Sequence, residues 1–254
     1  MSALWIAVLT FVLVFGGAIV GTYIRLVLPH HHLQEDSRDV VKVVVALTAT
    51  LSAVLFSLLI ASAKNFYDAQ TTEVEQLAGR IILLDRILSV YGPEAAETRA
   101  ELRSVVTASV ERVWPSGPAG TSSLALPQGR LAPGVFFRRI VELAPHTEPQ
   151  RIAQAQAIQV ALSLGEIRLL MFSQRGNTVP PIFLAVLLFW VVVLFGGYGL
   201  LTRINGTMVA VLLVSALSIA SAMYLIVEFN HPYDGTIRIS DTIMRDALAQ
   251  MGQP

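Results

Sequence analysis

Acidic and histidine side chains able to bind a metal or move a proton gather in one short stretch, IVEFNHPYDGTIRIS at 226–240. Glu228 and His231 are three residues apart, so on a continuing helix they would share one face, as carboxylate–histidine metal pairs do. One Glu and one His are too few ligands for a tight site unless Asp234 or another subunit contributes. A metal-dependent membrane enzyme is therefore one hypothesis for this stretch.

The same residues also form the pattern of a helix end followed by a turn. Pro232 pushes the residue before it away from helical geometry, which weakens the helical pairing of Glu228 with His231. A run with Pro, Asp and Gly at this spacing is typical of a turn. We favour this interpretation and predict no bound metal at a turn made by Glu228, His231, Pro232, Tyr233, Asp234 and Gly235.

Other patterns that indicate enzymatic chemistry are missing from the sequence. The adjacent histidines His30, His31 and His32 would rarely converge on one metal, and we interpret them as part of a solvated loop. The chain contains no cysteine, which excludes disulfides, thiolate zinc sites and a cysteine nucleophile. It also has no nucleophile elbow, glycine-rich phosphate loop or zincin motif. We therefore predict neither a catalytic site nor a cofactor.

The elements that position these residues are predicted from composition and hydropathy. Of the 254 residues, 14% are charged, against roughly 25% in an average soluble protein. Four segments without Asp, Glu, Lys or Arg are each long enough to cross a membrane as a helix: 1–24, 43–63, 178–202 and 204–227. The first has no signal-peptide pattern, and we interpret it as an uncleaved span. The sequence predicts an all-α membrane protein.

Four domains follow along the chain. We predict transmembrane helices one and two in 1–64, a helical extramembrane domain in 65–177, transmembrane helices three and four in 178–228, and a turn and tail in 229–254. Within the helical domain, apolar residues recur every three or four positions and predict one buried helix face, at Val74, Leu77, Ile81, Leu84 and Leu88.

Helix ends in the middle of the chain are marked by capping and breaking residues. No Gly or Pro lies between Ser62 and Ala78, so the second span is expected to continue into the helical domain until Gly92-Pro93. Thr147 and Gln150 have the spacing of a capping box at the start of a helix that runs to Arg175. Two more helices are expected between these, at 94–114 and 135–143, separated by a loop rich in Pro and Gly.

The second span carries two stripes with a four-residue spacing. Leucines recur at 47, 51, 55 and 59, and small residues recur at 49, 53, 57 and 61, a spacing that lets helices approach closely. Two interpretations stay open: ordinary packing within one chain, or several copies of this span around a pore that gates by dewetting. The candidate pore-lining residues are Leu47, Thr48, Leu51, Ser52, Leu55, Phe56 and Leu59.

Two stretches give the chain a resemblance to a known family. LFSLLIASAKNFYDAQTTEVEQLAGRIILLDRILSVYGPEAAETR at 55–99 and VEFNHPYDGTIRIS at 227–240 are similar to the bacterial bestrophin-like membrane protein family, which is distantly similar to bestrophin anion channels. The resemblance implies a homo-oligomeric ion channel, by analogy a pentamer that conducts anions through a pore lined by the second span. It also implies a multi-pass protein of the bacterial inner membrane with both termini and the 65–177 domain in the cytoplasm, and a turn and tail at 229–254 that pack on that domain.

Charge narrows the range of partners. The net charge is zero with 16 Arg and 2 Lys, so no basic field indicates nucleic acid. Residues 64–178 hold 12 basic and 11 acidic side chains, a balance that favours neither ion sign. The expected partners are membrane lipid, further copies of the chain and inorganic ions. The alternative to a channel is a non-conducting scaffold or sensor whose helical domain binds a partner.

Overall fold

The computed structural model describes residues 2–27, 35–115, 133–173, 179–202 and 205–251, and these form two compact units. The first unit comprises Met1–Tyr67 and Asn177–His231, and the second comprises Asp68–Gly176 and Pro232–Pro254. Three features of the sequence analysis lie wholly or mainly outside the described residues: the histidines at 30–32, the loop between 114 and 135, and the helix end at Arg175.

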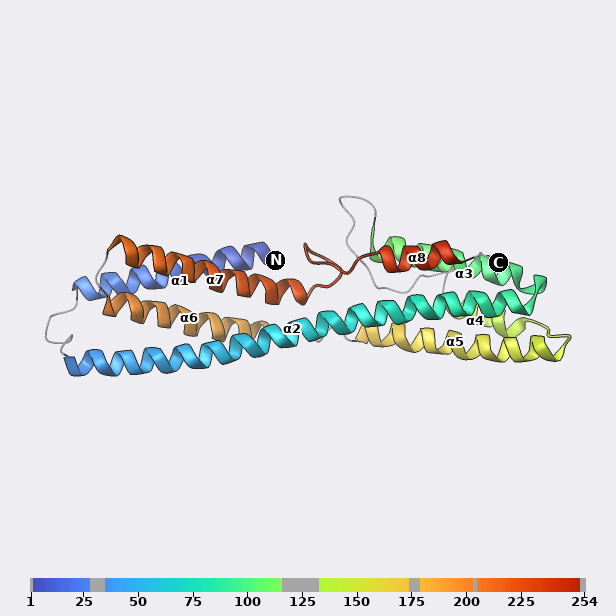
Figure 1. Ribbon diagram of the computed structural model, residues 1–254, viewed down its shortest axis with the longest axis horizontal. Coiled ribbons are helices and arrows are strands. Elements are labelled where there is room, and N and C mark those ends of the chain that lie inside the picture. The colour runs from blue at the N-terminus through green and yellow to red at the C-terminus, as the bar shows by residue number, and fades with distance from the viewer. Residues whose placement is uncertain (1, 28–34, 116–132, 174–178, 203–204, 252–254) are drawn as a thin grey trace. The chain divides into compact units, whose positions relative to one another are not determined.

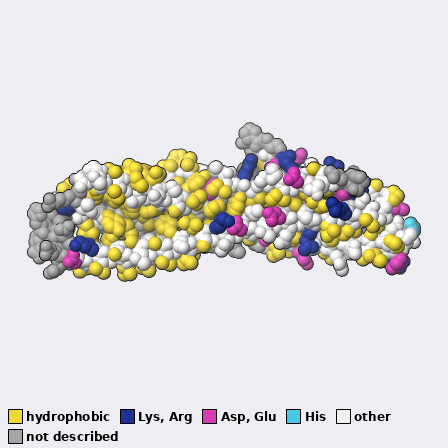
Figure 2. All heavy atoms as spheres, in the orientation of Figure 1, with side chains coloured by type: hydrophobic (Ala, Val, Ile, Leu, Met, Phe, Trp, Pro, Cys, Tyr) yellow, Lys and Arg dark blue, Asp and Glu magenta, His cyan; other side chains and the backbone are white. Residues whose placement is uncertain are grey.

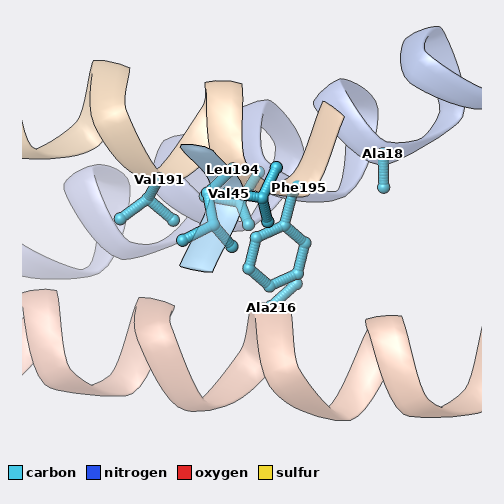
Figure 3. Close-up of a cluster of buried hydrophobic side chains, with 7 residues drawn as sticks. Ala18, Val45, Val191, Leu194, Phe195 and Ala216 are labelled. Atoms are coloured by element: carbon cyan, nitrogen blue, oxygen red, sulfur yellow. The ribbon is translucent and has the colours of Figure 1, made fainter. Parts of the chain in front are cut away.

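The first unit is a bundle of long apolar helices. It consists of α1 (Ala3–Val27), the N-terminal part of α2 (Glu35–Tyr91), α6 (Pro181–Leu201) and α7 (Gly206–Phe229), which lie side by side (Figure 1). All four helices contribute to one buried apolar cluster, formed by Val14, Ala18, Val45, Val191, Leu194, Phe195 and Ala216. Figure 3 shows the Phe195 ring of α6 directed toward Ala216 of α7.

Glycines of α1 and α6 allow the backbones of these two helices to approach closely. A Cβ atom added at Gly21 would lie 1.9 Å from the carbonyl oxygen of Gly196, and one at Gly199 would lie 2.2 Å from the carbonyl oxygen of Ala18. No side chain larger than hydrogen fits at either position without moving the helices apart. Such close backbone approach through small residues is how helices associate where the hydrophobic effect is absent.

Five of the described helices are long and apolar enough to cross a membrane, judged by length and composition: α1, α2, α5 (Glu148–Ser173), α6 and α7. Four of them coincide with the predicted spans. The mean hydropathy of their most apolar stretch is 2.3 to 2.5, whereas that of α5 is only 1.2. Hydrophobic side chains dominate the visible face of the first unit, and charged side chains gather on the second unit (Figure 2).

The second unit is also built of helices, joined by turns and loops, over its described residues. It contains the C-terminal part of α2, a 3-10 turn at Pro93–Ala95, α3 (Ala96–Val113), α4 (Pro133–Glu142), α5 and α8 (Thr242–Gln250). The apolar seam predicted along α2 is confirmed at four of its five residues: Val74, Ile81, Leu84 and Leu88 are all at most 5% exposed, whereas Leu77 is half-buried. The tail packs within this unit, where α8 contacts α3.

Local sequence signals placed the helix ends correctly. The α2 helix runs without a break for 57 residues, about 85 Å at 1.5 Å per residue. It ends before Gly92, whose φ of 121° lies in the left-handed region that favours glycine. The capping box is confirmed as well: Thr147 N donates to Gln150 Oε1 over 3.2 Å, and Gln150 N donates to Thr147 Oγ1 over 3.4 Å.

Candidate functional site

The candidate pore residues of α2 lie on different faces of the helix in the single chain. Leu47 and Leu51 are exposed, with 60% and 46% of their surface accessible. Ser52 is buried and Phe56 packs against the apolar cluster of the first unit. The remaining three are half-buried at the border between the two faces: Thr48, Leu55 and Leu59. The structure therefore brings Ser52 and Phe56 together with the bundle core and leaves Leu47 and Leu51 open.

Helix geometry explains why a regular sequence stripe spreads over two faces. At 3.6 residues per turn, a step of four residues advances the helix by roughly 40° more than one turn. The leucine stripe therefore winds around α2, from exposed Leu47 to half-buried Leu59. The small-residue stripe winds in the same way, with Ala49 packed on the core and Ala53 exposed. A four-residue repeat by itself consequently marks no single face of a straight helix.

The hydroxyl groups of this span differ in their hydrogen bonding. Thr48 Oγ1 donates to the Val44 carbonyl oxygen over 2.8 Å, and Thr50 Oγ1 donates to that of Ala46 over 3.0 Å. Such bonds to the preceding turn satisfy a hydroxyl without a second helix. Ser52 Oγ is buried and has no partner within the described part of the chain. This oxygen is therefore available for a hydrogen bond with a group outside the described part of the chain.

The end of α7 is shaped by Asn230 rather than by a metal pair. Asn230 is buried, its Nδ2 donates to the Ile226 carbonyl oxygen over 2.7 Å, and its Oδ1 accepts from Val179 N over 3.3 Å. His231 is exposed and places Nδ1 2.9 Å from the Val227 carbonyl oxygen. Since a carbonyl oxygen only accepts, Nδ1 carries the proton in this hydrogen bond. Glu228 is buried on the last turn of α7.

The residues after His231 are held by the second unit. Tyr233 donates its hydroxyl to Gln70 Oε1 of α2 over 2.9 Å, and its ring packs edge-on against Trp114 at a centroid distance of 6.1 Å. Trp114 Nε1 donates to the Ile239 carbonyl oxygen over 2.9 Å, and Ile239 N donates to that of Pro232 over 2.8 Å. These contacts fasten the turn and the start of the tail to α2 and α3.

Residues 232–235 form a turn after α7, as the sequence pattern predicts. Pro232 and Tyr233 are buried, whereas Asp234 and Gly235 are exposed, and the Gly235 φ of 127° favours glycine. Within the described ranges, no group of three or more His, Cys, Asp or Glu side chains is arranged to hold a metal ion. The arrangement of Glu228, His231 and Asp234 therefore gives the metal hypothesis no support.

Sequence reasoning missed the residues that make these contacts. Gln70, Trp114 and Asn230 act through partners up to 163 positions away, and no local pattern marks them. The glycine contact of α1 and α6 did leave a signal. Gly17 and Gly21 have the small-residue spacing of close-packed membrane helices, and Gly196, Gly197 and Gly199 cluster in the third span.

Comparison with known proteins agrees with this architecture. A family model described as a Bestrophin-like domain matches residues 11–244. Among solved structures, a mutant of a bacterial bestrophin homologue from Klebsiella pneumoniae aligns with a TM-score of 0.58 over 97% of this chain and 99% of that one. The two sequences are 13% identical, so the likeness extends to the fold alone. No curated protein matches the sequence significantly.

Proposed function

The chain belongs to the Bestrophin-like family, and from this premise we propose that it is a subunit of a homo-oligomeric ion channel rather than an enzyme. The observation that carries the proposal is the open face of α2. In the most apolar 18-residue stretch of α2, only 11% of the residues are buried by the chain itself. The corresponding share is 17% for α1, 28% for α6 and 22% for α7. A span so little covered by its own bundle is suited to line an axis between subunits.

The proposed topology has four spans. We assign α1, the first part of α2, α6 and α7 to the membrane, corresponding to 1–64 and 178–228, and we assign 65–177 and 229–254 to the cytoplasm. The α5 helix remains outside the membrane in this proposal, because it packs on α4 in the second unit and carries four charged residues: Glu148, Arg151, Glu166 and Arg168. An even number of spans puts both termini on one side, proposed as the cytoplasmic side of a bacterial inner membrane.

The proposed pore is lined by the open face of α2 and its border. Leu47 and Leu51 lie on that face, with Thr48 and Leu55 at its edge. Rings of these side chains would form an apolar neck that excludes water when narrow. Leu59 lies at this edge as well, whereas Ser52 and Phe56 would reach the axis only if α2 rotated away from the core. We propose anions as the permeant ions and five as the subunit number, both by analogy with bestrophins.

A cysteine-accessibility experiment tests the pore. Because the natural chain has no cysteine, each single-cysteine variant has a unique thiol. Leu47→Cys, Leu51→Cys and Leu55→Cys would be reconstituted in liposomes and treated with an anionic, water-soluble thiol reagent while ion flux is recorded. Thiols react as thiolates, which form in water but not in lipid. We expect the reagent to reduce flux in these variants, since it places a charge in the neck.

Matched controls come from exposed positions on other spans. Val193 of α6 and Val214 of α7 are 50% and 60% exposed, so Val193→Cys and Val214→Cys test whether exposure alone explains labelling. In the proposed channel both positions face lipid, so the reagent should leave ion flux through the Val193→Cys and Val214→Cys channels unchanged. Equal sensitivity of α2 variants and controls would contradict the assigned pore face. Oligomers that conduct no ion under any tested gradient would favour the scaffold function instead.

A further inference from the structure

The second unit contains a partly open cavity of about 140 Å³ that the proposed channel function does not use. Side chains of α2, α3, α4, α5 and α8 line it, and nearly all of them are apolar, including Ile81, Val106, Phe136 and Met244. A cavity of about 150 Å³ lined by apolar side chains stays dry and admits a molecule the size of benzene. The cavity therefore has room for a small apolar body.

Two polar side chains, Arg168 of α5 and Ser109 of α3, also reach this cavity. Arg168 Nη2 donates to Ser109 Oγ over 3.2 Å, and Ser109 Oγ in turn donates to the Val105 carbonyl oxygen over 2.7 Å. Within the described part of the chain, this is the one hydrogen bond of the Arg168 guanidinium. A guanidinium has five N–H donors, so most of its donors are left for another acceptor.

The charge of Arg168 is poorly compensated at this position. Burial lowers the pKa of Arg168 from its usual value, and the nearby positive charge of Arg112 acts in the same direction. An arginine stays protonated at neutral pH in spite of such an environment. Pairing with an anion, and not loss of the proton, would therefore relieve the unfavourable energy of this partly desolvated cation. Among the described residues, no carboxylate lies within ion-pair distance of this guanidinium.

We infer that this cavity is a binding site for a small amphipathic monoanion, whose carboxylate pairs with Arg168 while its apolar body fills the space between α3, α4 and α5. A guanidinium matches a carboxylate with two parallel hydrogen bonds, and Ser109 is placed to support the contact. A single negative charge balances a single positive one, so the attraction between them offsets part of the cost of desolvating both groups. An apolar pocket with a small number of polar groups directed into it is typical of small-molecule binding sites.

The cavity size points to a short chain or a single ring. Hexanoate and benzoate have a carboxylate and an apolar part of about the size of benzene, which suits a volume of this order. Hexanol and benzyl alcohol share the apolar part without the charge, and hexylamine carries the opposite charge. The five compounds therefore separate the contribution of charge from that of apolar burial.

Isothermal titration of the full-length protein in detergent tests the site. We expect hexanoate and benzoate to bind with Kd values below about 1 mM, and the alcohols and the amine to bind at least tenfold more weakly. Arg168→Gln removes the charge and is expected to weaken carboxylate binding at least tenfold while leaving the alcohols unchanged. Any partition of the ligands into detergent is the same in both proteins and cancels in the comparison.

The chain offers a matched control in Arg80. This exposed arginine also donates to a serine on a neighbouring helix, from Nη1 to Ser163 Oγ over 2.7 Å, but it does not line the cavity. Arg80→Gln should leave hexanoate binding unchanged. A second variant, Ala161→Leu, fills part of the cavity from α5 and should abolish binding of all ligands even if Arg168→Gln folds poorly. Equal affinity for hexanoate and hexanol, equal effects of the two arginine variants, or no binding of either carboxylate would overturn the inference.

Discussion

At the scale of single residues, the glycines of α1 and α6 set the spacing of the first unit. Gly21→Ala would place its Cβ 1.9 Å from the Gly196 carbonyl oxygen, so the two helices have to separate. Overpacking of this kind costs about 1–3 kcal/mol or more. We expect a clear fall in the thermal unfolding temperature in detergent. Gly16→Ala on the same helix meets no atom within 4 Å, and an equal loss in that variant would contradict the explanation.

Tyr91 is a second residue whose environment predicts a measurable effect. It is buried, and its hydroxyl has no partner among the described residues. Burial raises the pKa of Tyr91, and Glu94 adds to the rise. The unfolded chain therefore loses this proton first, near pH 10. The contribution to stability is complete below that pH and is lost as the pH rises through the folded-state pKa.

The Tyr91→Phe variant tests both statements by chemical denaturation at two pH values. At pH 7 we expect equal or slightly greater stability than in the natural protein, since an unpaired buried hydroxyl is replaced by hydrogen. Above pH 10 the variant should lose less stability than the natural protein does. A marked loss at pH 7 would instead show that the hydroxyl has a partner in the assembled protein.

At the scale of elements, the buried ion pair between α2 and α3 holds the second unit in register. Arg99 Nε and Nη2 lie 3.0 and 2.9 Å from the two carboxylate oxygens of Asp85, which is only 4% exposed. The hydrogen bond to Asp85 raises the pKa of Arg99, against the opposing effect of burial, so Arg99 stays charged throughout the neutral range. The fork geometry also makes the contact directional.

Removing one partner of this pair should destabilise the contact between the two elements. Arg99→Met leaves Asp85 charged and buried, and breaking a buried pair in this way costs about 3–5 kcal/mol. Guanidinium unfolding followed by circular dichroism measures the loss. The exposed pair of Arg151 and Glu148, with N···O of 2.8 Å, is the control, because Arg151→Met should change stability little or not at all. Similar losses in both variants would mean that burial of the pair is not the cause.

At the scale of the whole molecule, the open faces of the first unit predict assembly. Large apolar side chains of α2 remain exposed in the single chain, among them Val43, Leu47, Leu51, Val54 and Leu58. Lipid covers such a face if the protein is a monomer, and neighbouring subunits share it around an axis if the protein is a channel. We expect native mass spectrometry in mild detergent or nanodiscs to find a closed ring with a defined number of subunits, five by analogy.

The mass measurement separates the remaining functions at this scale. A ring places several copies of α2 around one axis and leads directly to the flux experiment. A monomer that is stable across detergents and lipids would contradict the channel, because one chain offers no polar path among its described spans. The family relation would then reflect shared architecture, and the scaffold function would be preferred.

The sequence by itself determined the features that depend on one helix and its immediate neighbours. Uncharged segments of sufficient length identified α1, α2, α6 and α7, because hydropathy is a local sum. The buried seam from Val74 to Leu88 and the capping box of Thr147 and Gln150 are equally local, since both depend on residues three or four positions apart. The turn at Gly235 belongs to the same group.

Only the tertiary structure decided which side of each helix meets another. The leucine stripe of α2 winds over two faces of the helix. Only the packing of α2 in the apolar cluster with Val191 and Phe195 of α6 shows that the side of Val45 is buried. Contacts of Trp114 with Ile239 and of Arg168 with Ser109 join residues 125 and 59 positions apart. Such pairs follow from how whole helices pack, and no periodicity within one segment records which distant partner a side chain will meet.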